Sequence, residues 1–136
     1  MSSMNVLLSI KPKYASKIME GTKKYEFRKS IFKQKTVDMV YIYSSYPVKK
    51  IIGKFTVGDI LEDHPDNLWD TVQNQSGLNE SEFFNYFQGK SKGFAIEIDE
   101  FTSFKNPIDP KLHFDNFIPP QSFRYVTHEF EELCHN

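Results

Sequence analysis

Apolar and polar positions along this chain of 136 residues change several times between a period of two and a helical period. Short apolar or alternating runs predict strands at residues 5–10, 25–28, 37–43, 50–61 and 93–101, with another near 123–126. Apolar residues at helical spacing predict helices at 12–20, 66–73 and 80–87, and a short helical C-terminal end. We find no repeat and no linker, so residues 1–136 are expected to form a single domain.

Five to six short strands with inserted helices predict an α+β fold that is mainly β. The most economical arrangement is a small β-barrel, closed or partly open, because a barrel removes exposed sheet edges. The 13 Phe and 7 Tyr residues favour strands and supply flat faces for stacking. Gly53 lies inside a predicted strand and indicates a bulge or a close approach of two backbones.

The most informative segment follows the first helix. Pro12 suits the first helical position, and Gly21 suits the left-handed residue that ends a helix. In the next strand, alternation places Glu26 and Arg28 on the same face. Lys23 lies too close to the glycine for the pattern to fix its direction. Charge of both signs at this density predicts a functional site, although a solvated surface ion pair is the simpler alternative.

The net charge of −1 conceals an asymmetry. Residues 1–54 contain 12 Lys and Arg against 3 Asp and Glu, a balance of +9, and include a Lys-rich loop after Lys29. The remaining residues contain 5 against 15, a balance of −10. A face that gathered the basic residues would attract phosphates. The alternative is that the charges mix in three dimensions.

Several classes of function lack their usual signals. Cys134 is the single cysteine and has no partner for an intramolecular disulfide. No secretory signal or membrane-length apolar run is present, so we expect a soluble, cytoplasmic protein without membrane contact. His128 and Glu129 lack the second histidine of a zinc helix, and no glycine-rich phosphate loop occurs. We therefore expect no metal and no cofactor.

The residues resemble the ASCH domain family, a branch of the PUA-like superfamily. The resemblance covers about residues 5–126 and is carried by Gly21-x-Lys23-x-x-Glu26-x-Arg28, which matches the family's G-x-K-x-x-E-x-R signature. It is supported by the preceding Ser-Ile-Lys-Pro at 9–12 and by the order of the strands and helices. The resemblance implies a β-barrel with a cleft between barrel and helix, lined by the motif. It also implies a role in binding RNA or modified nucleosides.

One branch of that family is an amidohydrolase acting on acetylcytidine through the motif lysine, a threonine three positions later and a distant glutamate. Lys23 matches the lysine, but Glu26 stands in place of the threonine. The region expected to hold the distant glutamate reads Gln75-Ser76-Gly77 and contains no carboxylate. Other members are ribonucleases, and cleavage of RNA without a metal needs a base and cations, roles that Glu26, Lys23 and Arg28 could fill.

Three functions therefore stay open: binding, which is preferred, catalysis, and a protein-interaction module whose charges are only a surface. In the first, a cationic cleft binds RNA or a nucleotide-like ligand through five ligand-binding residues: Lys11, Tyr14, Lys23, Glu26 and Arg28. In it, Glu26 orients the two cations and reduces their repulsion, and a tyrosine among Tyr14, Tyr25 and Tyr46 could stack a base. The alternative is a small hydrolase without a metal, a ribonuclease or an amidohydrolase, with Lys23 and Glu26 as catalytic residues.

A segment with two prolines, 119–122, is interpreted as a rigid connector or as a neighbour of the cleft.

Overall fold

A computed structural model describes residues 5–33 and 37–135. Part of the Lys-rich loop, with Lys35, lies outside the described residues. The strands are β1 (Val6–Ile10), β2 (Tyr25–Arg28), β3 (Met39–Ser44), β4 (Lys50–Asp63), β5 (Gly93–Ile108) and β6 (Phe123–Tyr125). The α-helices are α1 (Pro12–Glu20), α2 (Pro65–Val72), α3 (Glu80–Tyr86) and α4 (His128–Leu133), and two 3₁₀ turns are η1 (Gln73–Gln75) and η2 (Pro110–Leu112).

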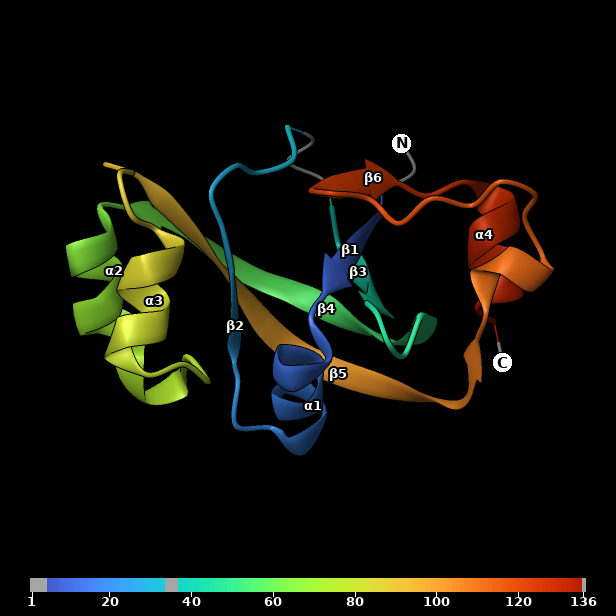
Figure 1. Ribbon diagram of the computed structural model, residues 1–136, viewed down its shortest axis with the longest axis horizontal. Coiled ribbons are helices and arrows are strands. Elements are labelled where there is room, and N and C mark those ends of the chain that lie inside the picture. Colours follow the sequence, from blue (N-terminus) through green and yellow to red (C-terminus); the bar gives the residue numbers. More distant parts are fainter. Residues whose placement is uncertain (1–4, 34–36, 136) are drawn as a thin grey trace.

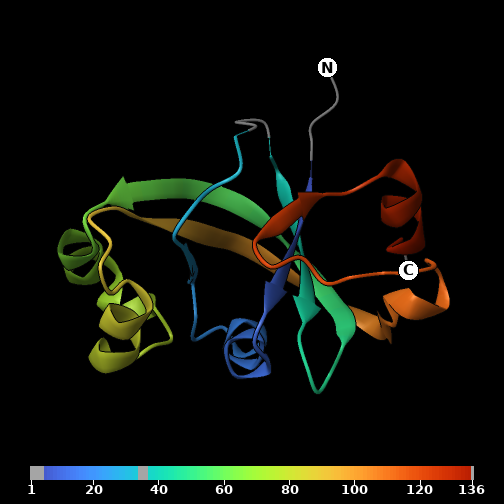
Figure 2. The same ribbon diagram turned by 45° about the horizontal axis from the view of Figure 1, so that its top comes forward.

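The six strands form one curved sheet in the order β2-β5-β4-β3-β1-β6. Neighbouring strands are antiparallel except β1 and β3, which are parallel. Figures 1 and 2 show the sheet wrapping partly around its concave side, as a half-barrel, with α1 close to β2 and β5. The predicted α+β class is confirmed, with the barrel in its partly open form.

Both faces of the sheet are covered, which explains the near-continuous apolar runs of β1 and β3. Alternate residues of β1 enter two different cores. Val6 and Leu8 pack inside the half-barrel with Ala15 and Ile18 of α1. Leu7 packs on the opposite face with Phe130 of α4. A third core holds α2 and α3 against the sheet through Phe27, Leu68, Val72, Phe83, Phe87 and Ala95.

Strand β5, with 16 residues, continues seven residues past its predicted end at Phe101, whereas β4, with 14, ends two residues beyond the prediction. Together they extend beyond the half-barrel as a ribbon whose far end carries α2 and α3 (Figure 1). The register between them shifts next to Gly53, where an added β-carbon would lie 2.5 Å from the Thr102 carbonyl oxygen. The predicted close approach at Gly53 is therefore confirmed. Pro107 falls between the paired residues Ser103 and Ile108, where this shift leaves the ladder irregular, so the strand continues past the predicted end.

The two edge strands, β2 and β6, approach each other at the open side of the half-barrel. Arg28 of β2 donates a hydrogen bond from Nη2 to the carbonyl oxygen of Ser122, 2.7 Å away, just before β6. Beyond β2, the ring of Phe32 meets the ring of Phe123 edge to face at 5.7 Å. Side chains therefore join the edges that backbone pairing leaves open.

Within the described part of the chain, no helix has both the length and the apolar composition needed to cross a lipid bilayer.

Candidate functional site

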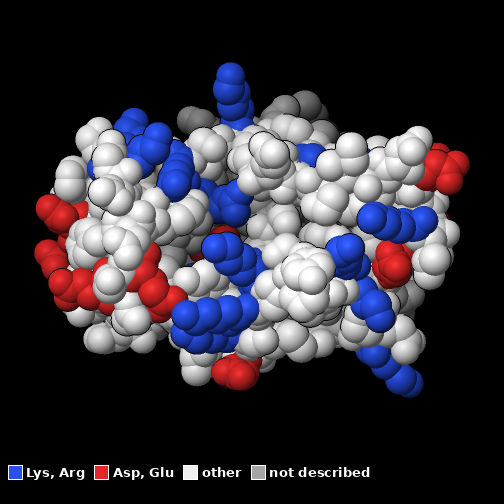
Figure 3. Space-filling model, viewed as in Figure 1, with Lys and Arg blue, Asp and Glu red and all other residues white. Residues whose placement is uncertain are grey.

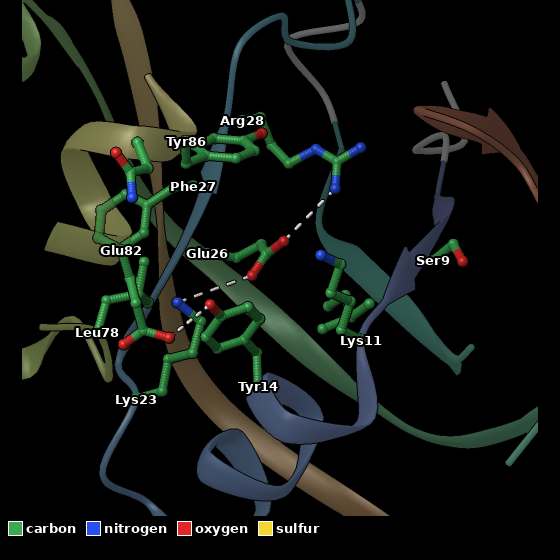
Figure 4. Close-up of a pocket in the computed structure, with 12 residues that line it drawn as sticks. Ser9, Lys11, Tyr14, Lys23, Glu26, Phe27, Arg28, Leu78, Glu82 and Tyr86 are labelled. Atoms are coloured by element: carbon green, nitrogen blue, oxygen red, sulfur yellow. Dashed lines mark hydrogen bonds and ion pairs between the residues drawn. The ribbon is translucent and has the colours of Figure 1, made fainter. Parts of the chain in front are cut away.

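A cavity of about 480 Å³ opens between α1, β2 and α3, at the end of β1. Figure 4 shows its polar side chains converging from these separate elements. The lining residues are Ser9, Ile10, Lys11, Tyr14, Lys23, Glu26, Phe27, Arg28, Leu78, Glu82, Asn85 and Tyr86. All five residues expected to bind ligand are among them.

Lys23 is the least exposed charged residue in this group, with 2% of its surface accessible. Its ammonium donates to the carbonyl oxygen of Ser76 at 2.9 Å and lies 4.6 Å from the centre of the Phe27 ring. Burial lowers the pKa of the amine from 10.5 to about 8, with a smaller contribution from Lys17, while Glu26 and Glu82 act in the opposite direction. Lys23 is therefore a buried amine that loses its proton more easily than an exposed lysine.

Glu26 lies between two cationic groups. Its Oε1 is 3.9 Å from Lys23 Nζ, and its Oε2 is 3.5 Å from Arg28 Nη1. Glu26 is 7% exposed and lines the cavity. The strand alternation that predicted a shared face for Glu26 and Arg28 therefore agrees with the structure, and Figure 4 shows the carboxylate between the two cations.

The rim of the cavity is cationic on the side of β1. Lys11, in the N-cap position of α1, is exposed to solvent at the rim. Arg28 contacts both Glu26 and the backbone of Ser122. The segment after the double proline thus lies beside the cavity, which was one of its two interpretations.

The pair Tyr14 and Glu82 closes the cavity between α1 and α3. The Tyr14 hydroxyl donates to Glu82 Oε2 at 2.9 Å, and Lys13 Nζ approaches the same oxygen at 2.6 Å. A bond from the Asn79 backbone N–H, together with those from Lys13 and Tyr14, lowers the pKa of Glu82 from 4.5 to about 2. Burial and the neighbouring carboxylate of Glu82 raise the pKa of Tyr14 to about 12. The carboxylate is therefore held in its charged form as a fixed link between the helices.

Sequence reasoning missed Glu82 and Tyr86 as lining residues. Glu82 carried a detectable signal, since Asn79 and Glu82 form a capping box at the start of α3. That signal marks a helix start and says nothing of Tyr14, which is 68 residues away. Tyr86 follows the helical pattern of the core residues, and its partial exposure toward the cavity depends on how α3 packs on the sheet.

The segment expected to hold a distant glutamate does lie next to Lys23, but it contributes backbone atoms. Ser76 supplies its carbonyl oxygen to Lys23, and the Gln75 carbonyl accepts from the Lys24 N–H at 2.8 Å. The carboxylate on this side of the cavity is Glu82, seven positions after Gln75. Of the tyrosines considered for stacking, Tyr14 lines the cavity, whereas Tyr46 is 77% exposed in the turn after β3. Tyr25 is partly buried and lies outside the lining residues.

The charges separate in space as well as in sequence on the face drawn in Figure 3. Lys and Arg side chains surround the central hollow, and most of the Asp and Glu side chains in this view lie at the end formed by α2 and α3, with a few at the opposite end and below the hollow. Among residues 5–33 and 37–135, no group of three or more His, Cys, Asp and Glu side chains is arranged to hold a metal ion.

The chain resembles several known proteins. A protein of Zymomonas mobilis named "ASCH domain-containing ribonuclease" is 29% identical over 130 residues, which cover 90% of this chain and 84% of that protein. A protein of Ureaplasma parvum named "Large ribosomal subunit protein uL22" is 23% identical over 126 residues, and the chain spans 39% of its length.

Solved structures agree with the family suggested by the sequence. The crystal structure of ASCH from Zymomonas mobilis superimposes with a TM-score of 0.88 and 28% identity, over 96% of this chain and 93% of the other. The predicted PUA-like fold is therefore confirmed. The model of the ASCH domain matches residues 8–104, and the chain belongs to the ASCH domain family.

Proposed function

We propose that this protein binds RNA or a nucleotide-like ligand in the cavity between α1, β2 and α3. The observation that carries the proposal is the convergence of Lys11, Lys23 and Arg28 on one cavity that also offers aromatic walls. Cations neutralise phosphate, a guanidinium can bind it with two parallel hydrogen bonds, and aromatic rings stack on bases. The related protein named as a ribonuclease supports RNA as the ligand class.

A second candidate function is cleavage of RNA without a metal. It is favoured by the name of the Zymomonas relative and by the lowered pKa of Lys23, about 8. Glu26 or the neutral amine of Lys23 would take the proton of a ribose 2′-hydroxyl, and the 2′-oxygen would bond to the adjacent phosphorus. The bond from phosphorus to the 5′-oxygen would break, and the leaving oxygen would take a proton from the protonated base or from water, which gives a 2′,3′-cyclic phosphate. Arg28 and Lys11 would stabilise the charge on the phosphorane. Binding requires only that these residues contact the ligand, whereas cleavage also requires a base aligned with the 2′-hydroxyl. Binding is therefore the primary proposal.

The binding proposal is tested with a labelled, short single-stranded RNA followed by fluorescence anisotropy. We expect affinity to fall steeply with salt, and the slope of log affinity against log salt to decrease by about one in Lys11→Gln. Lys111→Gln is the matched control, because Lys111 is exposed in η2, on the α4 side of the molecule (Figure 1). Absent binding, or equal salt slopes in the wild type and both variants, would count against the proposal.

The second candidate is tested on the same RNA in the presence of a chelator, with products separated on a gel. Cleavage that is lost in Lys23→Met and in Glu26→Gln, while circular dichroism shows both variants folded, would establish a ribonuclease. Binding without product would leave the cavity as a recognition site.

A further inference from the structure

The carboxylate of Glu26 has unused hydrogen-bonding capacity inside the cavity. It accepts a long hydrogen bond of 3.5 Å from Arg28 Nη1, and Lys23 Nζ lies 3.9 Å away; both distances exceed the usual length of a charged hydrogen bond. A buried carboxylate normally accepts several short hydrogen bonds, because its loss of hydration is costly. The arrangement therefore leaves acceptor positions on Glu26 for a ligand.

The three polar groups at this point occur in a definite order. Lys23 presents a donor, Glu26 two acceptors and Arg28 a donor, and all three line the same cavity. In Figure 4 the carboxylate lies between the ammonium and the guanidinium, with the rings of Tyr14 and Tyr86 on either side of it. A flat ligand with an acceptor at its edge and an N–H in the middle matches this order.

Nucleobases differ in this edge. Uracil presents O4, N3–H and O2, and guanine presents O6, N1–H and the N2 amino group. Both bases have a central N–H that can donate a hydrogen bond to a carboxylate, and a carbonyl oxygen that can accept one from a cation. Adenine and cytosine instead place a ring nitrogen acceptor at the centre, which would face the carboxylate lone pairs without a proton between them.

We propose that the row Lys23, Glu26 and Arg28 selects keto bases with a ring N–H, uracil and guanine, over the amino bases adenine and cytosine. This inference rests on the proposed binding function and adds the class of base that the cavity takes. Glu26 reads the ring N–H. In uracil the two cations read the flanking O4 and O2, and in guanine one cation reads O6 while the second carboxylate oxygen of Glu26 accepts from the N2 amino group. An ion pair whose only task was charge balance would be expected to draw closer, as paired carboxylates and guanidinium groups usually do.

The inference is tested by anisotropy with labelled oligoribonucleotides of equal length that contain uridine, cytidine, adenosine or N3-methyluridine. All four carry the same backbone charge, and N3-methyluridine keeps both carbonyls while lacking the ring N–H. We expect the uridine oligomer to bind at least about tenfold more tightly than the other three. Guanosine monophosphate should compete with the bound uridine oligomer more effectively than adenosine monophosphate.

A variant in the site supplies an independent readout. In Glu26→Gln the side chain can donate as well as accept, so the preference for uridine over cytidine and adenosine should disappear. Glu100→Gln is the matched control, because Glu100 is exposed on β5, outside the cavity, and should keep the wild-type preference.

The outcomes separate this inference from the proposed function. Equal binding of uridine and N3-methyluridine oligomers overturns the base selection and leaves RNA binding standing. If Glu26→Gln keeps the preference for uridine, other residues select the base, and the proposed selection by Glu26 is overturned. Absence of binding to every oligomer overturns the proposed function, and the base selection with it.

Discussion

Gly77 packs directly on the side-chain stem of Lys23. A β-carbon built on Gly77 would lie 2.7 Å from Cβ and 2.9 Å from Cγ of Lys23, closer than such atoms approach in proteins. Next to it, the Gly77 carbonyl accepts from Lys17 Nζ at 2.7 Å, and the Ser76 carbonyl accepts from Lys23. The segment before α3 thus covers the buried lysine with backbone alone and fixes where its ammonium lies.

Gly77→Ala is expected to destabilise the protein and to weaken ligand binding. The φ of Gly77 is +71°, so alanine adds left-handed strain of about 1–2 kcal/mol. Overlap with Lys23 adds roughly another 1–3 kcal/mol. The measurement is the free energy of unfolding in urea. Gly89→Ala separates the two terms, since Gly89 has a φ of +80° but no atom within 4 Å of an added β-carbon. Equal losses in the two variants would contradict the packing role.

Lys23→Met is expected to change how stability depends on pH in the alkaline range. The pKa of Lys23 is about 8 in the folded protein and 10.5 for an ordinary lysine. Between these values the unfolded chain binds more protons, so wild-type stability should rise with pH relative to the variant. The check is the difference in unfolding free energy between wild type and variant from about pH 7 to about pH 10. A constant difference would show that folding leaves the lysine pKa unchanged.

Arg28→Ala is expected to lower stability in addition to weakening ligand binding. The side chain is 13% exposed and joins β2 to the segment before β6 through Ser122. Loss of a charged hydrogen bond at a buried site costs about 1–3 kcal/mol. Arg124→Ala is the control, because Arg124 is exposed on β6 and lies over the Phe117 ring at 5.7 Å. If the two variants lower the midpoint of thermal unfolding equally, Arg28 does not stabilise the protein by joining β2 to the segment before β6.

Glu82→Gln is expected to alter stability in acid. The pKa of Glu82 is lowered from 4.5 to about 2 in the folded protein, chiefly by the Asn79 backbone N–H and by Lys13. This contribution is present above pH 4.5 and is lost as the pH falls through about 2, so the advantage of wild type over the variant should shrink over that range. Glu80→Gln is the matched control, because it removes the same charge from an exposed position in the same helical turn.

Local sequence signals were sufficient for most of the elements. Pro12 and Gly21 bound α1 as predicted, and the G-x-K-x-x-E-x-R spacing identified the family and residues that meet in one cavity. These features depend on residues close together in the chain. The length of β5 was missed, because Pro107 resembles a strand end and is tolerated only where the register shift leaves the pairing with β4 irregular.

The rest of the site depends on contacts between distant segments. The direction of Lys23 is set by Gly77 and by the Ser76 carbonyl, and nothing in residues 21–28 encodes it. Glu82 meets Tyr14 only because α3 is carried to α1 at the end of the β4 and β5 ribbon. Backbone carbonyls and the packing of helices leave no mark in a local pattern, so this part of the cavity required the structure.

The helical segment at the end of the ribbon formed by β4 and β5 is inserted between two neighbouring positions of the sheet, so it can be treated as an exchangeable cassette. It leaves the sheet after Asp63 and returns at Gly93, and these two residues are paired neighbours in the register of β4 and β5. A turn could therefore replace the intervening residues without changing the order of the strands. The cassette supplies Leu78, Glu82, Asn85 and Tyr86, whereas the half-barrel keeps Lys23, Glu26 and Arg28. Grafting a different helical segment between the same two positions would redesign one wall of the cavity, and would leave the charged row in place only if it kept the backbone of Ser76 and Gly77 that positions Lys23.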